Sequence, residues 1–125
     1  MVLGLGVDLI EMERVARALD RWDGRLVDKL MGPEEAARLP PPGPDRVLAI
    51  ARAIAAKEAA SKAIGTGWTR GVRWRDVVLE TGSGPSVRLD ARAGETARRL
   101  GSSGRTRTTL EVRGGLVLGE VRLLT

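Results

Sequence analysis

The amino-acid sequence predicts an α+β fold, in which an antiparallel sheet packs against a long central helix. Three observations predict it: an alternating apolar strand near the N-terminus, an uninterrupted helical pattern in the middle of the chain, and a glycine-turned hairpin at the C-terminus. The chain has 125 residues, of which 42% are hydrophobic, so we expect one domain, residues 1–125, with a substantial core. That core must be aliphatic, because three Trp are the only aromatic residues.

Residue types that the chain lacks exclude several kinds of chemistry. There is no Cys, which excludes disulfides, thiolate metal sites and cysteine nucleophiles and fits a reducing compartment. There is no His, which excludes serine–histidine triads and histidine metal ligands. A bound metal would need oxygen ligands, as Mg²⁺, Mn²⁺ and Ca²⁺ do. No apolar run approaches a membrane span and no signal-peptide pattern opens the chain, so we expect a cytoplasmic protein without a membrane partner.

The charge balance favours an acidic partner. The formal net charge is +5, from 21 Lys and Arg residues against 16 Asp and Glu residues, and a positive surface attracts acidic macromolecules. The arginines are dispersed, however, and the chain contains no aromatic stacking platform and no recognised DNA- or RNA-binding motif. Nucleic acid is therefore disfavoured as the partner.

The first predicted strand covers residues 2–7, and its two faces differ. One face is apolar and carries Leu3, Leu5 and Val7, whereas the other carries Gly4, Gly6 and Asp8. The glycines leave the second face bare, so another part of the structure can approach the backbone there. Asp8 is expected at the end of the strand, where two interpretations stay open. It fits a helix-capping box with Glu11, and it also fits a metal-binding carboxylate at the mouth of a strand.

An amphipathic helix is predicted for residues 11–21, followed by a shorter helical region within residues 26–39. The expected buried stripe of the first helix consists of Met12, Val15, Ala16 and Leu19. A basic stripe on the same helix consists of Arg14, Arg17 and Arg21, with Arg25 beyond it. Such a stripe is usually a solvated face, and the alternative is a docking surface for an acidic protein.

The central helix is predicted from about residue 46 to residue 64, after a proline-rich loop and with Asp45 as its N-cap. Glu58 and Lys62 are four residues apart and therefore project from the same face. The sequence Gly65-Thr66-Gly67 then ends the helix and forms a loop whose backbone can approach a ligand. These residues fit either a surface ion pair followed by a helix stop, or a site for a metal ion and a phosphate group.

The second half of the chain is predicted to contain mostly strands. The expected elements are a strand within residues 72–79, a turn at 82–85, a returning strand at 86–89, a helix over 90–100 and a hairpin of strands 106–112 and 116–123. Gly114-Gly115 supplies the turn of that hairpin. In the helix, Asp90 is the expected cap, and Ala93, Ala97 and Leu100 are expected to face inward.

Two of these stretches together resemble the holo-acyl-carrier-protein synthase family, the small class of 4′-phosphopantetheinyl transferases. The family begins with a strand that runs into Gly-(Val/Ile)-Asp, followed six residues after the Asp by an Arg; here these are Gly6-Val7-Asp8 and Arg14. Its central motif is similar to Phe-Ala-Ala-Lys-Glu-Ala-x-x-Lys-Ala-x-Gly-Thr-Gly, which residues 54–67 match at nearly every position. Two motifs at the expected separation are far more specific than either one alone.

The resemblance implies an enzyme that transfers 4′-phosphopantetheine from coenzyme A to a serine of an apo acyl carrier protein. It also implies a homotrimer of the family's fold, with active sites between subunits. The implied catalytic residues are Asp8, Glu58 and Lys62, with Asp8 and Glu58 holding Mg²⁺, or Mn²⁺, and Lys62 contacting the phosphate. The implied nucleotide pocket includes Gly65, Thr66 and Gly67, and the implied carrier-protein docking residues are Arg14, Arg17, Arg21 and Arg25.

The chain departs from the family's usual pattern where coenzyme A is contacted. Ala53 stands where the family has an arginine, and the nearest arginine is Arg52, a candidate coenzyme A contact that is rotated by about 100° around the helix. The family's histidine-containing hairpin motif is replaced by a stretch with Arg105 and Arg107, which can contact phosphate instead. Residues 82–85 lack the basic residue of the family's usual turn.

Two functional hypotheses follow from this pattern. One is a transferase with an altered coenzyme A pocket. The other is a relative that binds a carrier protein, or acts on a carrier-bound acyl chain, without phosphopantetheinyl transfer, because a fold does not by itself determine a function. The general base for the serine hydroxyl is either Glu58 or a metal-bound water, and the sequence does not choose between them.

Overall fold

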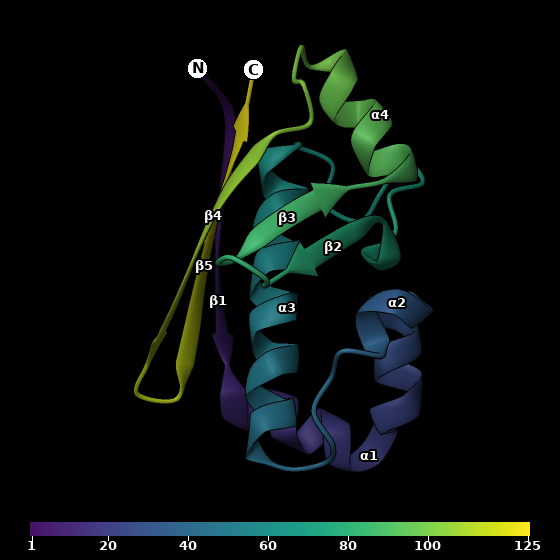
Figure 1. Ribbon diagram of the computed structural model, residues 1–125, viewed down its shortest axis with the longest axis vertical. Helices are drawn as coiled ribbons and strands as arrows, with labels where there is room; N and C mark the ends of the chain where they lie inside the picture. The colour runs from purple at the N-terminus through teal and green to yellow at the C-terminus, as the bar shows by residue number, and fades with distance from the viewer.

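The computed structural model describes residues 1–125 and has the predicted α+β architecture, built around the helix α3 (Figure 1). In chain order the elements are β1 (Val2–Glu11), α1 (Met12–Leu30), α2 (Pro33–Ala36), α3 (Pro44–Ala63), the 3₁₀ turn η1 (Trp74–Asp76), β2 (Val77–Glu80), β3 (Ser86–Leu89), α4 (Ala91–Arg99), β4 (Thr106–Arg113) and β5 (Leu116–Leu124). A three-stranded antiparallel sheet in the order β1-β5-β4 lies on one side of α3, and the β2–β3 hairpin lies on another.

The glycine face of β1 is where α3 meets the sheet. A Cβ atom at Gly6 would lie 1.8 Å from the carbonyl oxygen of Ala59, and one at Gly4 would lie 2.0 Å from that of Ala63. No side chain fits in this space, so the helix backbone rests almost directly on the strand backbone. The sequence predicted that another part of the structure would approach this bare face, and that part is the central helix α3 of the same chain.

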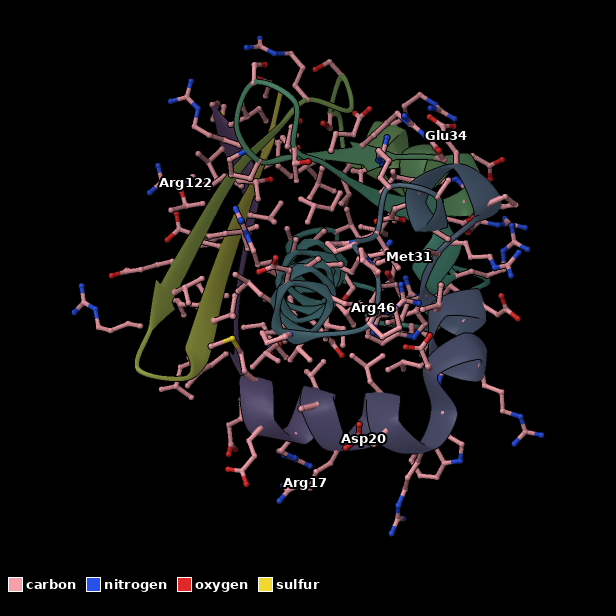
Figure 2. All side chains as sticks on the ribbon, turned by 60° about the horizontal axis from the view of Figure 1, so that its bottom comes forward. Arg17, Asp20, Met31, Glu34, Arg46 and Arg122 are labelled. Carbon is pink, nitrogen blue, oxygen red and sulfur yellow. The ribbon has the colours of Figure 1, made fainter.

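The opposite face of the sheet has no element over it (Figures 1 and 2). Its apolar side chains are 37% to 57% exposed and are Leu3, Leu5, Val7 and Leu9 of β1 with Leu116 and Leu118 of β5. A single exposed apolar residue is ordinary, but a contiguous row across two paired strands marks an interaction surface. We call these six residues the outer apolar face.

The first strand is longer than predicted, and this changes the surroundings of Asp8. β1 continues to Glu11, so Asp8 lies within the strand, opposite Gly119 of β5, and not at its end. Glu11 is the N-cap residue of α1 and makes no side-chain cap hydrogen bond. The capping-box interpretation of Asp8 is therefore wrong, because the residue is paired in a sheet before the helix begins.

The predicted boundary near residue 21 corresponds to a break inside a longer helix. α1 runs to Leu30, and only Trp22 departs from helical geometry, with φ −139° and ψ 34°. Asp23, just after the break, binds Arg46 of α3 through two hydrogen bonds of 2.7 and 2.9 Å. Asp45 is not the cap of α3: Gly43 occupies that position, Pro44 follows it, and Asp45 lies in the first turn.

The second half of the chain follows the prediction with two differences. The hairpin of β4 and β5 and the returning strand β3 are confirmed. The strand expected within residues 72–79 is reduced to β2, because η1 occupies the preceding residues. Leu100 was predicted to face inward but is 48% exposed, because α4 ends at Arg99 and the chain turns away.

The core contains one buried ion pair. Lys57 of α3 is fully buried, and its Nζ donates to Glu35 Oε1 at 2.9 Å, to the carbonyl of Trp74 at 3.2 Å and to the carbonyl of Val77. Glu35 Oε2 in turn accepts the N–H of Leu79 at 3.2 Å. Three acceptors match the three N–H groups of an ammonium ion, so Lys57 ties α2, η1 and β2 to the central helix.

No helix of the structure is both long enough and apolar enough to cross a bilayer.

Candidate active site

The two sequence motifs meet at Lys62. Asp8 projects from β1 toward α3, and Lys62 Nζ donates to Asp8 Oδ1 at 2.8 Å and to the carbonyl of Val7 at 3.1 Å. The hydrogen bond that Lys62 donates to Asp8 raises the pKa of Lys62, and the nearby charge of Glu58 acts in the same direction. Lys62 is therefore a charged, oriented group, and half of its side chain stays open to solvent.

Glu58 lies one turn before Lys62 but is held by a different residue. Its Oε2 accepts a hydrogen bond of 3.3 Å from Nε1 of Trp68. No salt bridge joins Glu58 to Lys62, whose partner is Asp8, so the ion pair that the four-residue spacing suggested does not form. Trp68 was not among the predicted site residues. The only indication of it in the sequence is its position as an aromatic residue directly after the Gly65–Gly67 loop.

The donor atoms at this site fit a magnesium ion. Asp8 Oδ2 and Glu58 Oε1 accept no hydrogen bond within the protein, so each carboxylate keeps one oxygen free. No third carboxylate completes a protein-only cage. Mg²⁺ is commonly bound by one or two carboxylates together with waters and substrate phosphates, and the present pair suits that arrangement.

The Gly65–Thr66–Gly67 loop ends the central helix tightly. Gly65 and Gly67 have φ angles of +81° and +56°, the left-handed region that glycine favours. The N–H groups of Thr66 and Gly67 both donate to the carbonyl of Ser61 at 3.2 Å, and that of Gly65 donates to Lys62 at 3.0 Å. These three N–H groups serve the helix end, so contact with a nucleotide at this loop stays a prediction.

A family model described as the 4′-phosphopantetheinyl transferase superfamily matches residues 4–113. The chain belongs to this superfamily. It is 40% identical to the holo-[acyl-carrier-protein] synthase of Acidithiobacillus ferrooxidans, over 85% of this chain and 84% of that protein. It is 42% identical to the enzyme of the same name from Anaeromyxobacter sp. strain K, over 98% of this chain and 96% of that protein.

Solved structures of the family share the fold. The holo-[acyl-carrier-protein] synthase of Neisseria meningitidis superposes with a TM-score of 0.87 at 26% identity, covering 100% of both chains. The Helicobacter pylori enzyme, solved in complex with coenzyme A, superposes with a TM-score of 0.78 at 19% identity, covering 95% of this chain and 98% of that one. The predicted fold class and family are confirmed.

In this transferase-family chain, Arg52 faces the same cavity as Ala53. The cavity, of about 240 Å³, lies between α2, α3 and β2, and its lining includes Arg52, Ala53, Arg38, Glu35 and Thr81. The Nε atom of Arg52 is buried and has no hydrogen-bond partner. The rotation between positions 52 and 53 therefore does not separate their side chains into different cavities, because both positions border the same one.

Arg105 and Arg107 lie apart from the Asp8 site within one chain. They line a shallow hollow with Arg122 beside the chain termini, and Arg122 points away from α3 in Figure 2. In the register of the sheet, Arg107 pairs with Arg122, which pairs with Leu5 of β1, three residues or about 10 Å along the strand from Asp8. Neither Arg105 nor Arg107 has an ion-pair partner in the chain.

The basic stripe of α1 is exposed, as predicted. Arg14, Arg17 and Arg21 border one open hollow on this helix, and Arg17 points away from the body of the molecule in Figure 2. Arg25 follows the break in α1 and is also exposed. A second hollow, of about 240 Å³, lies beside the stripe and is lined mainly by apolar residues, with Arg14 shared between the two: Leu9, Ile10, Val15, Ala18, Leu26 and Ile54.

Proposed function

We propose that this protein transfers 4′-phosphopantetheine from coenzyme A to a serine of an apo acyl carrier protein, with Mg²⁺ as cofactor. The observation that carries the proposal is the meeting of the two motifs: Lys62 Nζ lies 2.8 Å from Asp8 Oδ1, and Glu58 is one helical turn away. The relatives named holo-[acyl-carrier-protein] synthase, at about 40% identity over most of both chains, support the same activity.

The reaction breaks one phosphorus–oxygen bond and makes another. The serine oxygen attacks the phosphorus that carries pantetheine, and adenosine 3′,5′-bisphosphate leaves with the electrons of the broken pyrophosphate bond. Phosphoryl transfer needs mainly positioning and neutralisation of charge. When bound by Asp8 and Glu58, Mg²⁺ supplies positive charge to the pyrophosphate oxygens.

Lys62 supplies a second, fixed positive charge. Asp8 orients its ammonium group, and the raised pKa of Lys62 keeps it charged at neutral pH. The serine proton also needs an acceptor, and the two candidates are still Glu58 and a metal-bound water.

We propose a homotrimer in which the outer apolar face of one subunit is covered by another. Two features support this assembly: an apolar row left open to solvent, and two unpaired arginines, Arg105 and Arg107, remote from Asp8 in the same chain. A neighbouring subunit would bring these arginines to the coenzyme A phosphates, while Arg52 would serve from within the chain. Light scattering coupled to size exclusion should give the mass of three chains, and a monomer would refute the assembly.

The carrier protein is proposed to dock on α1. The stripe of Arg14, Arg17, Arg21 and Arg25 would receive an acidic helix, and the apolar hollow next to Arg14 would take its apolar side chains. A cytoplasmic location stays a prediction.

The test is intact-mass spectrometry of an apo carrier protein incubated with this protein, coenzyme A and Mg²⁺. The expected result is a mass gain equal to the phosphopantetheine arm, abolished by EDTA and by Glu58→Gln. No gain on several apo carriers, with folded protein, would refute the transferase and leave a relative that binds carriers without this reaction.

A further inference from the structure

Trp68 connects the candidate metal site to the buried core. Its indole Nε1 donates to Glu58 Oε2 at 3.3 Å, and its ring stacks on Trp74 with centroids 3.9 Å apart and planes inclined by 20°. The carbonyl of Trp74 accepts a hydrogen bond of 3.2 Å from the buried Lys57. Two of the chain's three tryptophans thus lie between the ion pair in the core and a carboxylate at the surface.

The chemistry of each contact suits this connection. An indole N–H only donates, so it orients an ionised carboxylate and cannot ligate a cation itself. It uses one oxygen of Glu58 and leaves the other free. The stack fixes the plane of the Trp68 ring, while the hydrogen bond from Lys57 holds the backbone of Trp74 in place.

The chain turn before Trp68 adds a further constraint. Gly67 has φ +56°, and the hydroxyl of Thr69 donates to the carbonyl of Thr66 at 2.6 Å, so the loop that carries the indole is closed on itself. Glu58 otherwise lies on a half-open helix face, where its side chain would sample several rotamers.

We propose that Trp68 is a positioning residue for metal binding: its indole N–H holds the carboxylate of Glu58, and its stack on Trp74 anchors that contact to the Lys57–Glu35 pair. This inference rests on the proposed function, which assigns Glu58 to the metal. Groups that orient metal ligands in this way typically contribute about tenfold or more to metal affinity.

A matched pair of variants tests the hydrogen bond separately from the stack. Trp68→Phe keeps an aromatic ring against Trp74 but removes the N–H donor to Glu58. Trp74→Phe removes an indole from the same stack but keeps that donor, and the backbone carbonyl that Lys57 binds is also retained. Both variants should unfold at similar temperatures in circular dichroism.

The first readout is metal binding without substrate, measured by electron paramagnetic resonance of free Mn²⁺ with Mg²⁺ as competitor. Trp68→Phe should weaken Mn²⁺ binding about tenfold, whereas Trp74→Phe should change it by less than about twofold. In the transfer assay, Trp68→Phe should raise the Mg²⁺ concentration for half-maximal rate and leave the rate at saturating Mg²⁺ nearly unchanged. Equal Mn²⁺ affinities in folded Trp68→Phe and wild-type protein would overturn the inference and leave the transferase proposal intact.

The second readout follows Trp68 itself in the wild-type protein. The chain has three indole N–H groups, so a ¹⁵N spectrum of the whole protein shows three side-chain signals, assigned with Trp22→Phe and Trp74→Phe. The Trp68 signal should move as Mg²⁺ is added and should not respond in Glu58→Gln. A Trp68 signal that ignores bound Mg²⁺ would also overturn the inference. If wild-type protein neither binds Mn²⁺ nor transfers phosphopantetheine, the proposed function fails and the inference fails with it.

Discussion

Two lysines five residues apart on α3 meet opposite environments. Lys57 is fully buried among Glu35 and two backbone carbonyls. Lys62 is 51% exposed and is held at the surface by Asp8. Burial lowers the pKa of Lys57, an effect that the charge of Glu35 opposes, whereas the hydrogen bond to Asp8 raises the pKa of Lys62.

These environments determine which lysine can contact a ligand. All three N–H groups of Lys57 are used inside the protein, so none is left for a substrate. Lys62 has two acceptors in the protein, so one of its three N–H groups is free, and its side chain is open to solvent. We interpret Lys57 as a structural cation and Lys62 as a functional one, although both belong to the same sequence motif.

The largest expected effect is on stability, at Lys57. Lys57→Met should reduce the free energy of unfolding by about 3–5 kcal/mol, because it leaves Glu35 buried without its cation. Urea denaturation measures this loss. The double variant Lys57→Met with Glu35→Met should recover much of it, since it removes both buried charges. A loss below about 1 kcal/mol in the single variant would contradict the assignment of Lys57 as a structural cation.

In contrast to Lys57→Met, Lys62→Ala should have a large effect on the transfer rate and a small effect on stability. The exposed pair with Asp8 should contribute at most about 1 kcal/mol to stability. Loss of the fixed cation should lower the transfer rate about a hundredfold, equivalent to about 2.7 kcal/mol in the barrier. Transfer at the wild-type rate would remove Lys62 from the mechanism.

Arg14→Glu tests the proposed docking surface on α1. Reversing one charge of the basic stripe should weaken carrier-protein affinity about tenfold and leave coenzyme A affinity unchanged. Isothermal titration measures both affinities. Arg99→Glu on α4 makes the same change in net charge at an exposed position without an ion pair, and it should have little effect.

The smallest expected effect concerns the Asp23–Arg46 pair, which joins the break in α1 to α3. The hydrogen bond from Arg46 lowers the pKa of Asp23 in the folded state. The pair therefore stabilises the fold above about pH 4, the ordinary range of an aspartate, and this stabilisation is lost as pH falls through the lower folded-state pKa. Wild-type protein should melt slightly higher than Asp23→Asn at pH 6, and this difference should be smaller at pH 3.

The control for this measurement is Asp20→Asn. Asp20 lies on the same helix, is exposed and has no ion-pair partner. Its substitution should leave the melting temperature nearly unchanged at both pH values. A constant difference between wild-type protein and Asp23→Asn from pH 6 to pH 3 would show that the carboxylate charge is not what stabilises the pair.

The sequence alone was sufficient to predict the fold class and the family. It also identified Asp8, Glu58 and Lys62 as candidate catalytic residues. Local patterns carry this information: strand alternation, helical spacing and glycine turns act over a few residues, and the two motifs are contiguous. The hairpin of β4 and β5 was predicted almost to the residue, because Gly114-Gly115 defines its turn.

The contacts that these residues make depend on the three-dimensional fold. It paired Lys62 with Asp8, 54 positions away in the chain, in place of Glu58. It brought Trp68 to Glu58 and buried Lys57 against Glu35. Hydrogen bonds and burial of this kind depend on which distant segments become neighbours, and no local pattern in the sequence specifies that.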